Sequence, residues 1–116
     1  MLIAIGGIVI KSLLHRPAFF WYAAPALWQA KSAPGCLFSD VRGVRGVQFS
    51  LTAWESTAAM KAYAHSEPHA VAMRRTEALS SFGAFHHYQS DALSDWEEAL
   101  ARWDDAVDYP GWRLAG

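Results

Sequence analysis

The stretch from Val47 to Ser56, VQFSLTAWES, has the most regular pattern in the chain, because apolar and polar residues alternate in it as far as Ala53. A period of two is that of a β-strand, whose successive side chains point to opposite faces of a sheet. We therefore predict a strand over 47–53. Its apolar side chains are expected to face the helices of the fold. The polar set, Gln48, Ser50 and Thr52, is expected to leave a mixed face for a partner sheet or a cavity.

The segments on either side of this strand predict the remaining elements. Strands are predicted at Leu2–Ile10, where Gly6-Gly7 indicates a bulge or a close backbone approach, at Cys36–Val41 and at Phe82–Gln89. A turn at Arg42–Gly46 separates the second strand from the third. Helices are predicted from Pro17 to about Ala33 with a kink or restart at Pro25, from the N-cap Ser56 with a restart at Pro68, and after a capping box of Ser94 and Glu97.

This order of elements, β-α-β-β-α-β with a C-terminal helix, predicts the fold class. It is the split βαβ arrangement of a ferredoxin-like α+β fold, occupying 1–116 as a single domain. We expect helices on only one face of the sheet. The other face must then be buried, and a second copy of the chain is the usual solution. The sequence thus predicts a homodimeric α/β barrel.

Composition excludes several classes of function. The chain has 116 residues, 53% of them hydrophobic, and a formal net charge of −1. It has no basic stripe that could neutralise phosphates, so we expect no nucleic-acid partner. The single cysteine, Cys36, excludes an internal disulfide and is expected to be a small buried hydrophobe in a reducing compartment. Glycine-rich phosphate loops are absent, which gives no support to a flavin or nicotinamide cofactor.

The apolar N-terminal half predicts neither a signal peptide nor a membrane span. Positive charge follows the first apolar run at Lys11 instead of preceding it, and Arg16, Pro17 and Pro25 interrupt the stretch that continues from it. A spanning helix needs about 20 predominantly apolar residues. We expect a cytoplasmic protein with no membrane partner. The alternative, an anchor role for this half, predicts partition into the membrane fraction.

The segments LTAWES at 51–56, AMKAY at 59–63 and HAVAM at 69–73 resemble the antibiotic-biosynthesis-monooxygenase-like proteins of the dimeric α/β-barrel superfamily. Within it, the chain is most similar to a largely unassigned group related to spheroidene monooxygenase. The resemblance implies a dimer in which each subunit holds a pocket between sheet and helices. In that superfamily the pocket supports cofactor-free oxidation of aromatic polyketides, haem binding or breakdown, dye-decolourising peroxidation or ligand binding.

The resemblance also implies roles for two residues. Trp54, at the end of the third strand, is similar to the pocket Trp of quinone-forming and haem-degrading members. His69 is similar to the helix His that serves as axial ligand in haem-binding members. Several active members have a polarising Asn on the third strand, whereas this chain contains no Asn. Gln48, Ser50 or Thr52 could supply a hydrogen bond in its place.

The histidines are the candidates for acid–base or ligand chemistry. His69 and Met73 are spaced to lie on one helical segment, where they would either ligate haem iron or pack at the core boundary. His65 and His69 have metal-ligand spacing, but Pro68 breaks the helix between them, so no metal site is predicted. His86 and His87 are adjacent on a strand and must point to opposite faces. Only one of these two can enter the pocket.

The aromatic residues are the candidates for ligand contact. Trp54 and Tyr63 would form a wall for a flat molecule or pack in the core, and Phe20 and Trp21 would close the other side of the pocket.

The sequence thus favours a monooxygenase-like protein that binds a small apolar or aromatic molecule, with no cofactor expected. His69, His87 and Trp54 are the predicted catalytic residues, and Tyr63, Met73, Phe20, Trp21 and His86 the predicted ligand-binding residues. Oxygen would attack an enolate or phenolate of the substrate, with a His as base. The alternative is a non-catalytic dimer that binds a ligand or haem.

Overall fold

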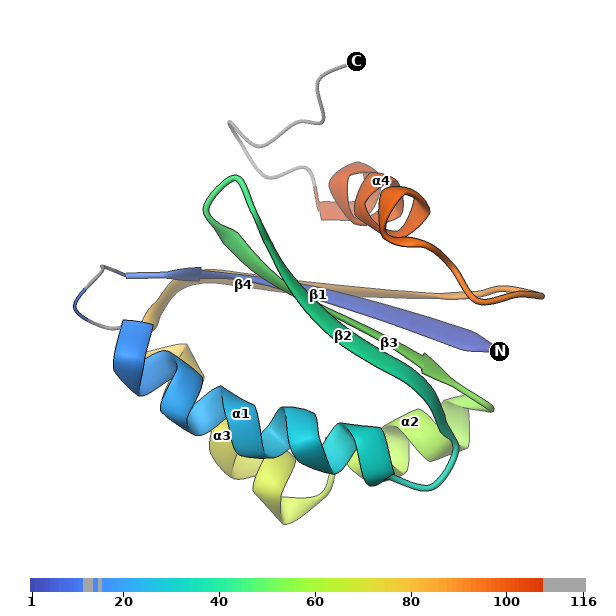
Figure 1. Ribbon diagram of the computed structural model, residues 1–116, viewed down its shortest axis with the longest axis horizontal. Helices are drawn as coiled ribbons and strands as arrows, with labels where there is room; N and C mark the ends of the chain where they lie inside the picture. Colours follow the sequence, from blue (N-terminus) through green and yellow to red (C-terminus); the bar gives the residue numbers. More distant parts are fainter. Residues whose placement is uncertain (12–13, 15, 108–116) are drawn as a thin grey trace.

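The computed structural model in Figure 1 describes residues 1–11, 14 and 16–107, apart from the side chains at 19, 22, 23, 25–28, 67, 68, 71, 72, 76 and 77. Its elements, in chain order, are β1 (Leu2–Ile10), α1 (Arg16–Ser32), β2 (Cys36–Val44), β3 (Val47–Trp54), α2 (Thr57–Ala64), α3 (Glu67–Ala78), β4 (Ser80–Gln89) and α4 (Trp96–Val107). This order confirms the predicted ferredoxin-like α+β fold.

The four strands form one antiparallel sheet in the order β2-β3-β1-β4. Strand β2 continues to Val44, so the predicted turn over 42–46 is wrong in length, and the hairpin turns at Arg45 and Gly46 alone. Both residues have positive φ, 51° and 80°, as a two-residue hairpin loop requires. The ladder pairs Gly43 with Gln48 and so includes a glycine that the pattern had assigned to the turn.

The helix boundaries follow from local chemistry. Ser56 is confirmed as N-cap of α2, since its hydroxyl accepts a hydrogen bond from the Ala59 amide at 3.1 Å. The chain leaves the helix at His65 and begins α3 at Glu67, which confirms the predicted break before Pro68. Helix α1 runs without a break through position 25, so the predicted restart there is wrong.

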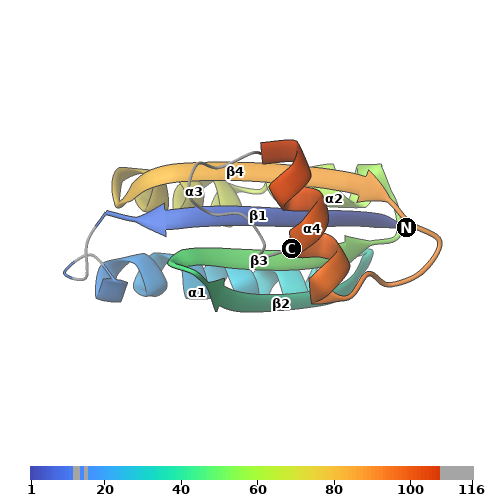
Figure 2. The same ribbon diagram turned by 90° about the horizontal axis from the view of Figure 1, so that it is seen from above.

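The two faces of the sheet are covered by different helices. Helices α1, α2 and α3 lie along one face, and α4 crosses the other (Figures 1 and 2). The expectation that helices cover only one face is therefore wrong. We call the face toward α1–α3 the inner face and the face toward α4 the outer face.

The apolar side chains of β3 belong to the outer face. Phe49 meets the indole of Trp103 edge-on, with 4.8 Å between ring centroids, and both side chains are fully buried. Val47, Leu51 and Ala53 join the same core beneath α4. The apolar side chains of β3 were predicted to face the helices. They face α4 alone, and the polar side chains of β3 face α1, α2 and α3.

Polar contacts fix α4 on this face. The Trp96 indole donates to Asp40 Oδ2 at 2.9 Å, and the Trp103 indole donates to the Ala84 carbonyl at 3.1 Å. The predicted capping box is wrong by one residue, because Asp95 Oδ1 accepts from the Glu98 amide at 2.8 Å. The hydroxyl of Ser94 instead lies 2.6 Å from that of Tyr88.

Because α4 buries the apolar outer face within one chain, a second copy is not needed to shield it from water. Dimerisation stays a prediction. In the part of the chain that the structure describes, no helix has both the length and the apolarity to cross a membrane.

We predict that Gly7→Ala destabilises the fold by about 1–3 kcal/mol, because adding a side chain to a packed core forces its neighbours to move. A Cβ at Gly7 would lie 2.8 Å from ring carbons of both Phe49 and Trp103. Chemical denaturation measures the effect. The matched control is Gly83→Ala on the adjacent strand, where the nearest atom would be 3.8 Å away. Equal stability of the two variants would contradict this description of the core.

Candidate functional site

The inner face carries the polar row of β3. Gln48, Ser50 and Thr52 alternate with the core residues of that strand and pair across the ladder with Gly43, Val41 and Ser39 of β2. The β1 and β4 residues on this face are Leu2, Ala4, Gly6, Ile8, Gly83, Phe85, His87 and Gln89. Gln89 is anchored there by a 3.5 Å hydrogen bond to Thr57 of α2. The inner face therefore combines hydroxyl groups with apolar and aromatic side chains.

Three predicted site residues form one cluster of contacts on this face, at the C-terminal end of β3. The ring of Trp54 stacks on Tyr63 of α2, with centroids 5.2 Å apart and planes 28° apart. Tyr63 in turn meets His69 of α3 edge-on at 4.7 Å. We call Trp54, Tyr63 and His69 the aromatic cluster. Trp54 is completely buried, and its indole donates to Thr52 Oγ1 at 2.9 Å, which fixes the ring on the sheet.

The hydrogen bond of His69 defines its tautomer. Its Nδ1 lies 3.1 Å from the carbonyl oxygen of Ala64. A carbonyl can only accept, so Nδ1 must carry the proton and Nε2 keeps its lone pair. Burial lowers the pKa of His69 below its usual 6.5, with a smaller opposing contribution from the Ala64 hydrogen bond. The imidazole is therefore neutral at pH 7, with Nε2 able to take a proton or bind a metal.

Tyr63 is held in its neutral form. Burial raises the pKa of its hydroxyl to about 12, so the phenol keeps its proton across the physiological range. The Tyr63 ring can therefore contribute stacking and a hydrogen-bond donor, but no phenolate.

Phe85 is the other aromatic residue of the inner face. Its ring lies over Gly6 of β1, where any Cβ would overlap ring carbons. The side chain is 57% exposed even though it lies on the sheet face toward α1–α3. An aromatic ring that is held in place and left open to solvent is a surface to which a flat ligand can bind.

Two clefts are lined by some of these residues and by the helices on the same side of the sheet. One, of about 540 Å³, is lined by Ile8, Met73, Ser80, Ser81, Phe82, Gly83 and Phe85. The other, of about 550 Å³, is lined by Gln29, Ser32, Ala33, Pro34, Gly35, Glu55, Ala59, Ala62, Tyr63 and Ser66. Tyr63 thus belongs to both the aromatic cluster and the second cleft.

Two buried polar atoms near the inner face have no hydrogen-bond partner among the described residues. They are Ser39 Oγ, on the strand position that pairs with Thr52, and Gln29 Oε1 of α1. The amide nitrogen of Gln29 donates to Ser66 Oγ at 3.3 Å, which fixes the orientation of that side chain. Buried groups of this kind usually have partners, so a bound molecule with polar atoms would satisfy them.

The remaining predicted site residues lie apart from the aromatic cluster. Met73 lines the cleft beside Phe85, and His87 is exposed on the inner face two positions further along β4. His86 lies on the outer face, where its ring stacks on Tyr88 with centroids 5.9 Å apart. His86 and the aromatic cluster are therefore separated by the sheet, and His87 is the one of the pair that faces inward.

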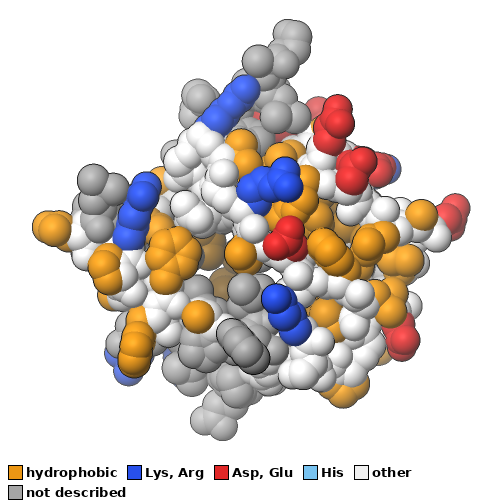
Figure 3. All heavy atoms as spheres, in the orientation of Figure 1, with side chains coloured by type: hydrophobic (Ala, Val, Ile, Leu, Met, Phe, Trp, Pro, Cys, Tyr) orange, Lys and Arg blue, Asp and Glu red, His pale blue; other side chains and the backbone are white. Residues whose placement is uncertain are grey.

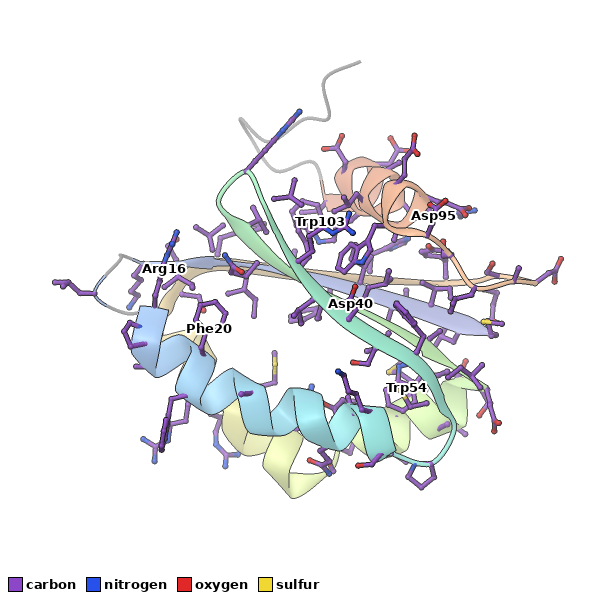
Figure 4. The ribbon with its side chains drawn as sticks, in the orientation of Figure 1. Arg16, Phe20, Asp40, Trp54, Asp95 and Trp103 are labelled. Carbon is purple, nitrogen blue, oxygen red and sulfur yellow. The ribbon has the colours of Figure 1, made fainter. Side chains whose placement is uncertain are left out.

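The side chains of the two predicted ligand-binding residues of α1 point in different directions. Phe20, labelled in Figure 4, lies on the side of α1 toward the sheet and is half-exposed. Trp21 is 76% exposed and points into solvent, so it does not close the pocket. Sequence reasoning missed Phe85 and Ser39. The Gly6-Gly7 pair was a signal for the close approach of Phe85, but the register that brings Phe85 to Gly6 is not encoded in a local pattern.

No group of three or more potential metal ligands is found among the side chains that the structure describes.

Comparison with solved structures defines the fold class. The chain has the same fold as solved structures that include one named an antibiotic biosynthesis monooxygenase, which confirms the fold that the resemblance implied. It superposes on the crystal structure of an antibiotic biosynthesis monooxygenase with a TM-score of 0.72 and 17% identity, covering 79% of this chain and 100% of that one. A conserved protein from Methanosarcina mazei Go1 matches with a TM-score of 0.72 and 10% identity, over 78% and 92% of the two chains. A protein from Mycobacterium tuberculosis matches with a TM-score of 0.71 and 12% identity, over 82% and 100%.

No protein-family model matches the sequence, and no curated protein is significantly similar to it. At these identities the structural likeness establishes the fold and leaves the activity to be argued from the site.

We predict that His69 makes the fold less stable in acid. Because the pKa of His69 is lowered in the folded chain, the unfolded chain binds its proton more readily, so stability is lost as the pH falls through 6.5 toward the lowered value. His69→Gln should flatten the fall in the free energy of unfolding between pH 7 and pH 5. The control is His87→Gln, at an exposed ring. A wild-type slope that His69→Gln leaves unchanged would contradict the assignment.

Proposed function

We propose that this protein binds a small flat aromatic or apolar molecule against the inner face of its sheet and oxidises it with O2 without a cofactor. The observation that carries the proposal is the exposed Phe85 ring on the same sheet face as the buried aromatic cluster. An exposed aromatic ring and hydroxyl side chains on one sheet face suit a planar molecule that has polar substituents.

The described residues supply the parts that such a reaction needs. Ser50 offers a hydroxyl for a phenolic or carbonyl oxygen, and Ser39 has an unpaired buried one. In the proposal, Nε2 of His69 is the base, because its tautomer leaves that nitrogen able to accept a proton. Tyr63, whose ring is stacked on the buried Trp54, holds the ring plane of the substrate.

The proposed reaction is balanced without an external reductant. The base removes a proton from an activated CH2 group of the substrate's keto tautomer, and the enolate gives an electron to O2. The two radicals combine to form a C–O bond and a peroxide. Loss of the second proton from that carbon breaks the O–O bond, so the CH2 becomes C=O and the other oxygen leaves as water.

A hydroquinone that can be followed by its products tests this proposal. With 1,4-dihydroxynaphthalene and O2, we expect 2-hydroxy-1,4-naphthoquinone and water, whereas autoxidation gives 1,4-naphthoquinone and hydrogen peroxide. His69→Gln should lower the rate about 10²-fold or more, as expected for loss of a general base. The matched control is His86→Gln, on the opposite face, which should retain the rate. Product formation at the autoxidation rate, or equal rates in both variants, would contradict the proposed reaction.

Binding can be tested separately from turnover. Menadione, a flat naphthoquinone, should bind the wild type and quench its tryptophan fluorescence. Phe85→Ser should weaken this binding about tenfold, since an aromatic contact is worth roughly 0.5–1.5 kcal/mol beyond the area it buries. His86→Ala, which changes the neighbouring residue on the other face, is the control. Equal affinities in wild type and Phe85→Ser would place the binding elsewhere.

A second candidate function, haem binding, is favoured by the anchoring of His69. Histidine ligands of metals usually donate their second ring N–H to a backbone carbonyl or carboxylate, as His69 does to Ala64. His69 would hold the haem iron through Nε2, and residues of the inner face would contact the haem ring. The bound haem would supply redox chemistry at its iron.

If the protein binds haem, added haem should give a Soret band shifted from that of free haem, and His69→Ala should abolish the shift. His87→Ala should keep it. Free-haem spectra for the wild type would rule out this function without affecting the aromatic-ligand proposal.

A further inference from the structure

Exposed apolar residues gather at the end of the molecule where α1 begins. Leu14 is 91% exposed and Trp21 is 76% exposed, and Phe20 beside it is half-exposed. Trp21 is one helical turn after Pro17, and Phe20 is one turn after Arg16, so each lies next to an exposed residue of the first turn of α1. With Lys11 and Arg16 they form what we call the basic–apolar end.

Positive charge surrounds these apolar groups. Lys11 and Arg16 are both exposed, and neither forms an ion pair within the described part of the chain. Figure 3 shows Lys and Arg among hydrophobic side chains at its left edge, while the Asp and Glu side chains visible in that view lie toward its centre and right.

The position of Arg16 is unfavourable for the helix itself. The N-terminus of a helix has a partial positive charge, which acidic residues usually complement. Helix α1 has no acidic residue in its first turn and begins with an arginine, whose side chain extends away from the helix in Figure 4. A positive charge retained there is explained if it meets an external anionic surface.

This end also adjoins the apolar cleft. The Lys11 amide donates to the Leu79 carbonyl at 2.9 Å, which joins the end of β1 to the start of β4. The next residues of β4, from Ser80 to Gly83, line the cleft that contains Ile8, Met73 and Phe85. The cleft therefore lies close to Lys11 of the basic–apolar end.

We propose that the basic–apolar end contacts the surface of an anionic lipid bilayer, with Trp21 and Leu14 in the interface and Lys11 and Arg16 at the headgroups. Exposed Trp and Leu flanked by Lys and Arg is the combination that binds membrane surfaces without spanning them. The cleft would then take its apolar ligand from the bilayer, a consequence that rests on the proposed function.

Flotation with lipid vesicles tests the contact. At about 0.1 M salt, the wild type should float with vesicles of three parts phosphatidylcholine to one part phosphatidylglycerol, and much less with phosphatidylcholine alone. Trp21→Ala and Leu14→Ser should each lower the partition constant about tenfold, as expected for loss of buried apolar groups. Lys11→Glu combined with Arg16→Glu should abolish the preference for the anionic vesicles.

The control is Leu93→Ser, which removes a half-exposed leucine from the connection between β4 and α4, beside Asp91 and Asp95. It should leave the partition constant unchanged. An equal loss in this variant, or no flotation of the wild type, would overturn the proposal. So would a fall in molar mass by light scattering in Trp21→Ala without any vesicle binding, since that result would assign the patch to a second copy of the chain. Menadione binding in the absence of vesicles tests the ligand site independently.

Discussion

The burial of one sheet face by α4 is the constraint on which the rest of this structure depends. A four-stranded sheet whose strands alternate in polarity has one face that must leave water. Here the indole of Trp103 fills the space above Gly7 and packs edge-on against Phe49, and both rings are fully buried. Because a single C-terminal helix completes this core, the hydrophobic stabilisation of the sheet is concentrated on the outer face.

The inner face is thereby released from the requirement to be apolar. It carries a row of hydroxyl and amide side chains on β3, an exposed aromatic ring at Phe85 and the buried aromatic cluster. Such a face would be a poor core, since polar groups without partners are unfavourable when they are buried. It is suited to a bound molecule. This difference between the two faces would let one small domain combine a stable fold with the proposed binding surface.

The sequence predicted the elements well, because their signals are local. The alternation in Val47–Trp54, the Ser56 cap and the break before Pro68 depend on neighbouring residues only, and the structure confirms them. The assignment of faces failed for a physical reason. A period of two separates side chains into two sets, but it does not say which set meets which helices. That choice depends on α4, which packs on strands distant from it in sequence.

The residues of the candidate site were likewise predicted only where a local pattern determines their position. Trp54, Tyr63 and His69 were predicted as site residues, and they do contact one another. The opposite directions of His86 and His87 also followed from strand geometry. Phe85 was missed because its environment is set by the register that pairs it with Gly6 across two strands. Ser39 was missed because the bulge near Cys36 decides which residues of β2 face inward.

Intermolecular nuclear Overhauser effects from bound menadione test whether the inner face binds the ligand while the outer face stays closed. We predict contacts from the ligand protons to Phe85, Ile8 and Met73. Contacts to Phe49, Leu100 and Trp103 instead would contradict it, because they would show that α4 opens and that the ligand occupies the core.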